Sequence, residues 1–136
     1  MNQNVIHVGL DVDDTQYLGA AFDQRTGETI SFKCRPTLKG LVRQLEKLDA
    51  NFKDSNLILC YEASYIGFCL QRDLTEAGYH CDVIAPGSIP RKGGSKSVKT
   101  DRIDALDLAQ FHAKDLLTVV QPLFQSVVIA AVKSRS

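Results

Sequence analysis

Four acidic side chains stand where they could share a metal ion, namely Asp11, Glu62, Asp101 and Asp104. Asp11 and Glu62 each follow a short apolar run that predicts a strand, and neighbouring strands of an α/β sheet bring such terminal side chains together. Asp101 and Asp104 lie three residues apart at a predicted helix start, so both would face the same side. Taken singly, each acid could be a helix cap or a solvated strand end, but the set of four favours a shared site.

Carboxylate oxygens suit a hard divalent cation. Mg²⁺ takes oxygen ligands, usually a few carboxylates together with water and substrate phosphate. Two such ions about 3.5–4 Å apart can stabilise both the attacking and the leaving oxygen of a phosphodiester displacement. The sequence therefore predicts a site for one or two Mg²⁺ or Mn²⁺ ions that acts on a phosphodiester.

A group of basic residues accompanies the second acidic pair, namely Arg91, Lys92, Lys96, Lys99 and Arg102. The segment 86–100, which contains most of them, is rich in Gly, Ser and Pro and lacks periodicity, which predicts an exposed loop. Its cations could hold phosphates beside the carboxylates, while its glycines would allow close approach. The alternative is a flexible, solvated loop without a ligand.

The pattern of apolar residues predicts a mixed α/β sheet of five strands flanked by helices. Strands are expected at residues 5–10, 16–22, 28–34, 57–61 and 80–85. Helices are expected after Thr37 along residues 38–48, from a Ser64 N-cap to Ala77 before Gly78, and from a Thr100 N-cap to about residue 120. Tight turns join the first three strands, which should therefore be antiparallel, and later strands alternate with helices, with the first and fourth strands as neighbours.

The composition fits one globular domain. A chain of 136 residues leaves too little for a second core, so we expect a domain over residues 1–120 and a divergent tail over 121–136. Lys plus Arg and Asp plus Glu both total 16, so net charge argues neither for nor against a polyanionic partner. The four cysteines form no C-x-x-C pair, which argues against zinc and predicts reduced thiols in the cytoplasm. The chain has neither a signal-peptide pattern nor a long apolar run, so we expect no membrane association.

Three sequence blocks carry a resemblance to a known family. Gly9-Leu10-Asp11-Val12, Tyr61-Glu62-Ala63-Ser64 and Lys99-Thr100-Asp101-Arg102-Ile103-Asp104-Ala105 resemble the blocks of DEDD transposases. These are insertion-sequence recombinases whose first domain is similar to the Holliday-junction resolvase RuvC. The resemblance spans roughly residues 5–119. It implies a ribonuclease H-like, RuvC-type fold, DNA as substrate, and catalytic, metal-binding roles for Asp11, Glu62, Asp101 and Asp104.

The same resemblance implies parts that this chain does not supply. In that family a second, mostly helical domain carries a serine thought to attack DNA, and relatives use a structured guide RNA to choose their sites. Residues 121–136 do not look like the family's continuation, so we expect a truncated domain that is not competent alone. The implied partners are DNA, a guide RNA and, in a homo-oligomer, further copies of the chain.

Two other classes of function fit parts of the sequence. Asp11-Val12-Asp13-Asp14-Thr15 also matches the D-x-D-x-T opening of haloacid-dehalogenase-like phosphatases, in which Asp11 would be the nucleophile and Asp13 the general acid. That fold would not normally begin with an antiparallel meander. The third hypothesis is a non-catalytic remnant that binds nucleic acid or associates with a full-length partner. Metal-dependent nicking of DNA, hydrolysis of a phosphomonoester, or binding without turnover would separate the three.

Overall fold

A computed structural model describes residues 4–63, 67–86, 89 and 104–120, and within them five strands form one mixed sheet. The strands are β1 (Asn4–Val12), β2 (Tyr17–Phe22), β3 (Thr29–Cys34), β4 (Ser55–Glu62) and β5 (His80–Ile84). Their order is β3-β2-β1-β4-β5. β2 pairs antiparallel with β1 and with β3, whereas β4 runs parallel to both β1 and β5. The predicted ribonuclease H-like mixed sheet, with its first three strands antiparallel, is therefore confirmed.

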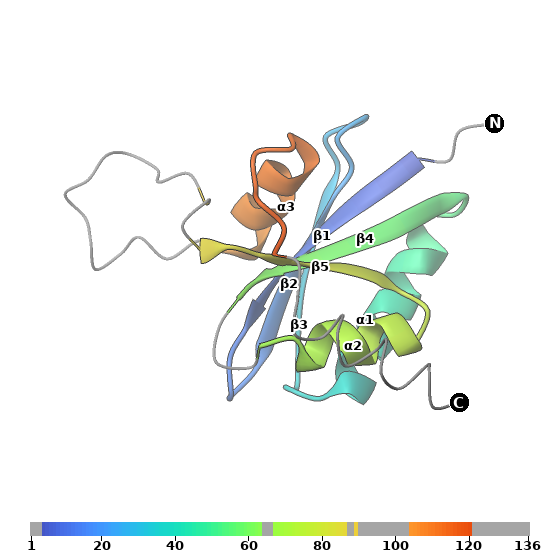
Figure 1. Cartoon of the computed structure of the whole chain (residues 1–136). Helices are drawn as coiled ribbons and strands as arrows, with labels where there is room; N and C mark the ends of the chain where they lie inside the picture. The colour runs from blue at the N-terminus through green and yellow to red at the C-terminus, as the bar shows by residue number, and fades with distance from the viewer. Residues whose placement is uncertain (1–3, 64–66, 87–88, 90–103, 121–136) are drawn as a thin grey trace, which may run out of the picture.

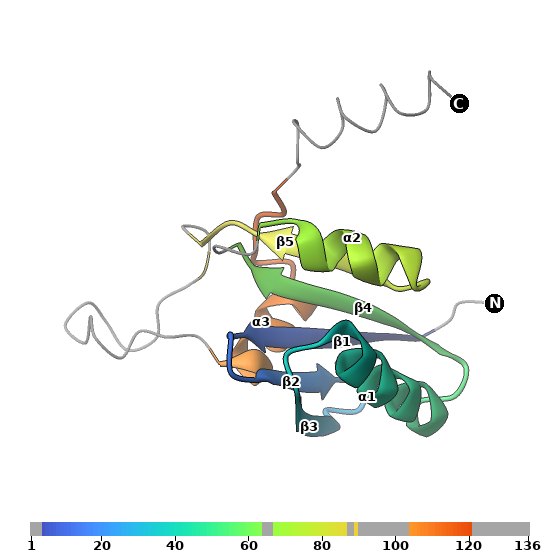
Figure 2. The ribbon, with the colours of Figure 1, turned by 90° about the horizontal axis from the view of Figure 1, so that it is seen from below.

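Within the described residues, three helices cover the two faces of this sheet. They are α1 (Leu38–Asn51), α2 (Cys69–Glu76) and α3 (Ala105–Ala113). Figures 1 and 2 show α1 and α2 on one face and α3 on the other. Among the described residues, no helix is long and apolar enough to cross a membrane. All four cysteines carry free thiols.

The main core lies between the sheet and the pair α1 and α2. The strands β1, β4 and β5 supply every second residue to it: Ile6, Val8, Leu10, Leu57, Leu59, Tyr61, Cys81 and Val83. The two helices supply Leu41, Leu45, Leu48, Leu70 and Leu74. Because side chains alternate along a strand, the residues between these positions face α3. A second, smaller cluster forms there from Cys60, Ile84, Ile89 and Leu108.

The start of α1 is as predicted. Thr37 has an extended backbone, and its hydroxyl oxygen accepts a hydrogen bond from the Gly40 amide at 3.0 Å. This bond satisfies one of the amides that a helix start leaves without a partner. The helix then buries leucines at intervals of three and four residues, which fixes α1 against the sheet.

The start of α2 differs from the prediction of a Ser64 N-cap. The helix begins at Cys69 after Phe68, which makes no side-chain capping bond, and Ser64 lies outside the described residues. Gly67 has a φ of 58°, a left-handed conformation through which a right-handed helix cannot run. The Tyr61 hydroxyl donates to the Gly67 carbonyl at 2.7 Å and accepts from the Gln71 amide at 3.1 Å, which ties this start to β4.

The last helix is shorter than predicted at both ends. It begins at Ala105, and Asp104 rather than Thr100 is its N-cap, with an extended backbone at a ψ of 170°. The prediction that Asp101 and Asp104 share a helical face is therefore wrong, because the helix does not run through Asp104; Thr100 and Asp101 lie outside the described residues.

After Ala113 the chain leaves the helix and returns to the sheet. Asp115 has a φ of 60°, and Val119 forms an isolated antiparallel bridge with Ile84 at the edge of β5. The Val120 amide donates to the Val83 carbonyl at 2.7 Å. The apolar residues Leu117, Val119 and Val120 therefore pack against the sheet at the edge strand β5, whereas the sequence pattern predicted that the helix continues through them.

Candidate functional site

Asp11 and Glu62 lie side by side where the carboxyl ends of β1 and β4 meet, at one end of the sheet that we call the carboxylate edge. In the parallel register of β1 and β4, Leu10 pairs with Tyr61, and each acid is the next residue of its strand. Neighbouring strands lie about 4.8 Å apart, so the backbones of the two acids are separated by roughly that distance. Since Leu10 and Tyr61 point into the main core, the side chains that follow them point to the α3 face.

The N-terminus of α3 faces the same edge. A Cβ built on Gly9 would lie 2.1 Å from the Ala105 carbonyl oxygen, whereas His7 contacts His112 near the other end of the helix. These two contacts show that α3 runs antiparallel to β1. Asp11 lies two residues beyond Gly9 on the same face, roughly 6–7 Å farther along the strand. The first turn of α3 is therefore aimed toward Asp11.

Asp104 occupies that first turn as the N-cap. Its Oδ1 accepts a hydrogen bond from the Asp107 amide at 2.8 Å. This bond satisfies one of the amides that the start of a helix leaves without an intrahelical partner. Because Oδ1 is engaged in capping, Oδ2 is the oxygen left to bind a cation. Asp104 and Glu62 are exposed, and Asp11 is partly buried.

The donor chemistry of these acids fits a divalent cation, although their side chains are not gathered around one point. All are carboxylates, the ligands that Mg²⁺ and Mn²⁺ prefer. Within residues 4–63, 67–86, 89 and 104–120, no three His, Cys, Asp or Glu side chains are grouped to hold a metal ion. The fourth predicted ligand, Asp101, lies outside those ranges.

Asp13 is engaged in the turn between β1 and β2. Its Oδ1 accepts from the Asp14 amide at 2.8 Å and its Oδ2 from the Thr15 hydroxyl at 3.1 Å. A small pocket is lined by Asp11, Asp13, Gln16 and Leu18. The dehalogenase-like hypothesis makes Asp13 the general acid in a fold that does not normally begin with an antiparallel meander. Here β1 enters such a meander, and both oxygens of Asp13 accept hydrogen bonds within its first turn. The structure gives that hypothesis no support.

The basic residues predicted to contact phosphate lie outside the described part of the chain: Arg91, Lys92, Lys96, Lys99 and Arg102. They remain predictions.

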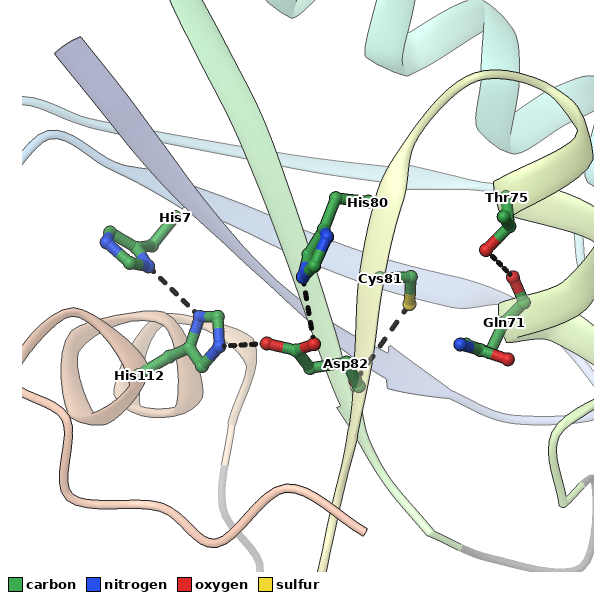
Figure 3. A network of polar contacts seen from close by, with 7 residues as sticks. All are labelled: His7, Gln71, Thr75, His80, Cys81, Asp82 and His112. Carbon is green, nitrogen blue, oxygen red and sulfur yellow. Dashed lines mark hydrogen bonds and ion pairs between the residues drawn. The ribbon is translucent and has the colours of Figure 1, made fainter. Parts of the chain in front are cut away.

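A second polar group lies on the same face and was not predicted from the sequence. Figure 3 shows His7 of β1, His112 of α3, and Asp82 and His80 of β5 joined in one row of contacts. His80 and Asp82 are two residues apart on a strand and so share a face, which is a signal that the sequence carries. The contact with His7 and His112 depends on the strand order and on the direction of α3.

Comparison with known proteins relates part of this chain to transposases. Over 81 residues, 60% of this chain, it is 40% identical to "Putative transposase y4qE" of Sinorhizobium fredii (strain NBRC 101917 / NGR234), and the match covers 20% of that protein. Over 51 residues, 38% of this chain, it is 47% identical to the transposase for insertion sequence element IS1533 of Leptospira borgpetersenii, of which 14% is covered. The chain thus matches a fifth or less of the length of these relatives. No family model matches the chain.

Among solved structures, the chain resembles the large terminase nuclease from thermophilic phage G20c. The TM-score is 0.43 at 17% sequence identity, and the match covers 83% of this chain and 56% of that one. This similarity is too low to support any conclusion about fold or function, and the description of the fold depends on the strand order alone.

Proposed function

We propose that this chain is the N-terminal RuvC-like domain of a DEDD transposase and takes part in DNA transposition through Mg²⁺-dependent phosphodiester chemistry. The observation that carries the proposal is the parallel register of β1 and β4, which sets Asp11 beside Glu62 at the edge toward which α3 directs Asp104. The similarity of part of the chain to two transposases supports the same function.

The proposed roles follow from the chemistry of each group. Asp11, Glu62, Asp101 and Asp104 would hold Mg²⁺ or Mn²⁺ through carboxylate oxygens. When bound, such an ion supplies positive charge that stabilises the charge developing on phosphate oxygens. The basic residues before Asp104 would hold the DNA backbone next to the carboxylates. The first turn of α3 adds the positive end of a helix dipole to the same edge.

Residues 1–120 form the domain in this proposal, and strand transfer needs more than this domain. The relatives are at least five times longer than the segments that match. We therefore propose that the chain acts together with a nucleophile-bearing domain, a guide RNA or further copies of itself, and that alone it binds metal and DNA with little or no strand transfer.

Metal binding can be tested by thermal unfolding. Mn²⁺ or Mg²⁺ should raise Tm, because an ion that binds only the folded state stabilises it by about 2.7 kcal/mol at a concentration of 100 Kd. The increase should disappear in Asp11→Asn. The unfolding of both proteins should be followed by circular dichroism over a series of metal concentrations.

Asp54→Asn is the matched control for that experiment. Asp54 lies just before the first residue of β4, at the opposite end of that strand from Glu62, and its φ of 65° is one that Asn tolerates. It should keep the wild-type response to metal. An equal shift in wild type and Asp11→Asn would place the ion elsewhere. No response to metal together with retained DNA binding would favour the non-catalytic remnant instead.

A further inference from the structure

All three histidines of the chain and one aspartate form a continuous row of contacts across three elements. His7 Nδ1 lies 3.0 Å from His112 Nδ1, and the two rings meet edge to face with an interplanar angle of 80°. His112 Nε2 lies 2.9 Å from Asp82 Oδ2, and His80 Nε2 lies 2.9 Å from Asp82 Oδ1. The row therefore joins the last turn of α3 to both β1 and β5.

The contacts fix where the protons of the row lie. Asp82 is held ionised, because the hydrogen bond from His112, opposed by burial and aided by His80, keeps the pKa of its carboxyl below the usual value. A carboxylate only accepts, so Nε2 of His112 must carry a proton and donate. In neutral His112 the other nitrogen, Nδ1, is then an acceptor, and His7 must donate to it from its own Nδ1.

The row can take up one proton but not two without losing a contact. If His112 becomes a cation, it donates from both nitrogens, to Asp82 and to His7, and His7 accepts as the tautomer protonated on Nε2. If His7 also becomes a cation, two N–H groups of like charge face each other across 3.0 Å. Burial, and next the charge of His112, lower the pKa of His7 to about 4, although Asp82 acts in the opposite direction.

In the part of the chain that the structure describes, the other residues around the row bring no further charge to His7. The cross-strand partners of His7 are Phe22 of β2 and Ile58 of β4, which share its face. The Cys60 thiol of β4 is buried, which raises its pKa well above the usual value and keeps it neutral. The titratable groups facing His7 are therefore His112 from α3 and Asp82 and His80 from β5, and Lys114 and Asp115 follow the end of α3.

We propose that His7, His112 and Asp82 form a proton-operated latch that holds the last turn of α3 on the sheet and releases it when both His7 and His112 are protonated. His80 contacts Asp82 at the exposed end of the row and is not part of the latch. The latch does not depend on the proposed transposase function. It has a consequence for that function, because α3 carries Asp104 at its other end, and loosening α3 would move this carboxylate away from Asp11 and Glu62.

Magnetic resonance on the full, untagged chain tests the latch directly. Since the chain has three histidines and all belong to the row, every imidazole signal reports on it. The His7 ring should titrate near pH 4, far below a free imidazole. Amide hydrogen-exchange protection of α3, relative to β1 and β4, should fall between about pH 6.5 and pH 4. In that range His7 binds a proton when α3 is released from the sheet, but not when α3 is held on it. The fall is at most about tenfold per pH unit, the limit for one proton.

Two variants separate the latch from ordinary packing. In His7→Asn the side-chain amide can donate to or accept from His112 but does not titrate, so α3 should stay protected at pH 7 and lose most of its acid sensitivity. His80→Asn is the control, because the His80 side chain is 62% exposed and ends the row; its α3 profile should match wild type. A His7 ring that titrates near 6.5, or an α3 profile unchanged by His7→Asn, would overturn the proposal. Should His7→Asn not fold, the wild-type ring titration decides alone.

Discussion

At the scale of single residues, Gly9 decides how closely α3 approaches the carboxylate edge. A Cβ at this position would lie 2.1 Å from the Ala105 carbonyl oxygen and 2.8 Å from the Ala109 amide nitrogen. Both are backbone atoms of the helix, so they cannot move aside as the end of a flexible side chain would. The absence of a side chain at Gly9 is therefore a requirement for seating the first turn of α3 against β1.

Gly9→Ala should destabilise the protein by about 1–3 kcal/mol, the usual cost of inserting a methyl group into a closely packed contact. The reason is that α3 must shift as a whole. Urea unfolding of wild type and variant gives the difference in free energy of unfolding, and metal binding should weaken in the same variant because Asp104 moves with the helix. Unchanged stability would mean that α3 does not pack this closely on β1.

Individual residues were predictable where a local rule determines them. The helix start after Thr37 and the positions of Asp11 and Glu62 at the ends of their strands could be predicted, because both depend on neighbours in the sequence. The N-cap of the last helix was predicted at Thr100 and lies at Asp104, since both side chains are suitable caps and nothing local distinguishes the two. The contact of His7 with His112 spans 105 residues, so only the assembled fold creates it.

At the scale of elements, α1 shows how a helix start depends on one side chain. Thr37→Ala removes the acceptor for the Gly40 amide and should cost about 1 kcal/mol of stability. Thr37→Ser keeps the hydroxyl and should remain within a few tenths of a kcal/mol of wild type. Thermal unfolding of the two variants side by side measures the cap without changing the core. Equal losses in both would point to the Thr37 methyl group rather than the hydrogen bond.

The errors in element boundaries have identifiable causes. In α2, a left-handed residue at Gly67 and the bonds of the Tyr61 hydroxyl set the start, and neither is visible as periodicity. Beyond α3, the spacing of the apolar residues around Val119 fits a helix as well as a strand. Their pairing with β5 is a long-range contact that the local sequence does not determine. Local patterns therefore located the elements correctly but did not fix where two of the helices begin or end.

At the scale of the whole molecule, the order of strand pairing determines where the candidate site lies. The first three strands are antiparallel, and β4 and β5 then add in parallel beside β1. Turns between the first three strands predicted a meander, and the helices between later strands predicted parallel pairing, so the sheet could be foreseen from its connections. The same topology sets the ends of β1 and β4 next to each other. What the sequence could not supply is how closely α3 approaches β1, because that depends on packing at Gly9.

The charge balance of the whole chain makes a last prediction about DNA. Acidic and basic residues cancel, with 16 of each, so binding to a polyanion must depend on where the cations are concentrated. We expect Lys96 and Lys99 to contact phosphates, and each contact with duplex DNA releases counterions. Replacing both by Ala should therefore make the slope of log affinity against log salt shallower by roughly 0.9 per lost contact. The change should be similar for all DNA sequences, because phosphate contacts carry no sequence information.

Affinities for linear and branched duplexes at several salt concentrations, with and without Mg²⁺, measure this slope. Lys39→Ala together with Lys47→Ala is the matched control, because it removes the same charge from α1, on the face of the sheet opposite to α3. This control should leave the slope at the wild-type value. If the slope instead becomes shallower by the same amount in both double variants, the DNA is held by the general charge of the protein. If it changes in neither, Lys96 and Lys99 are solvated surface, and the DNA lies elsewhere than beside the carboxylate edge.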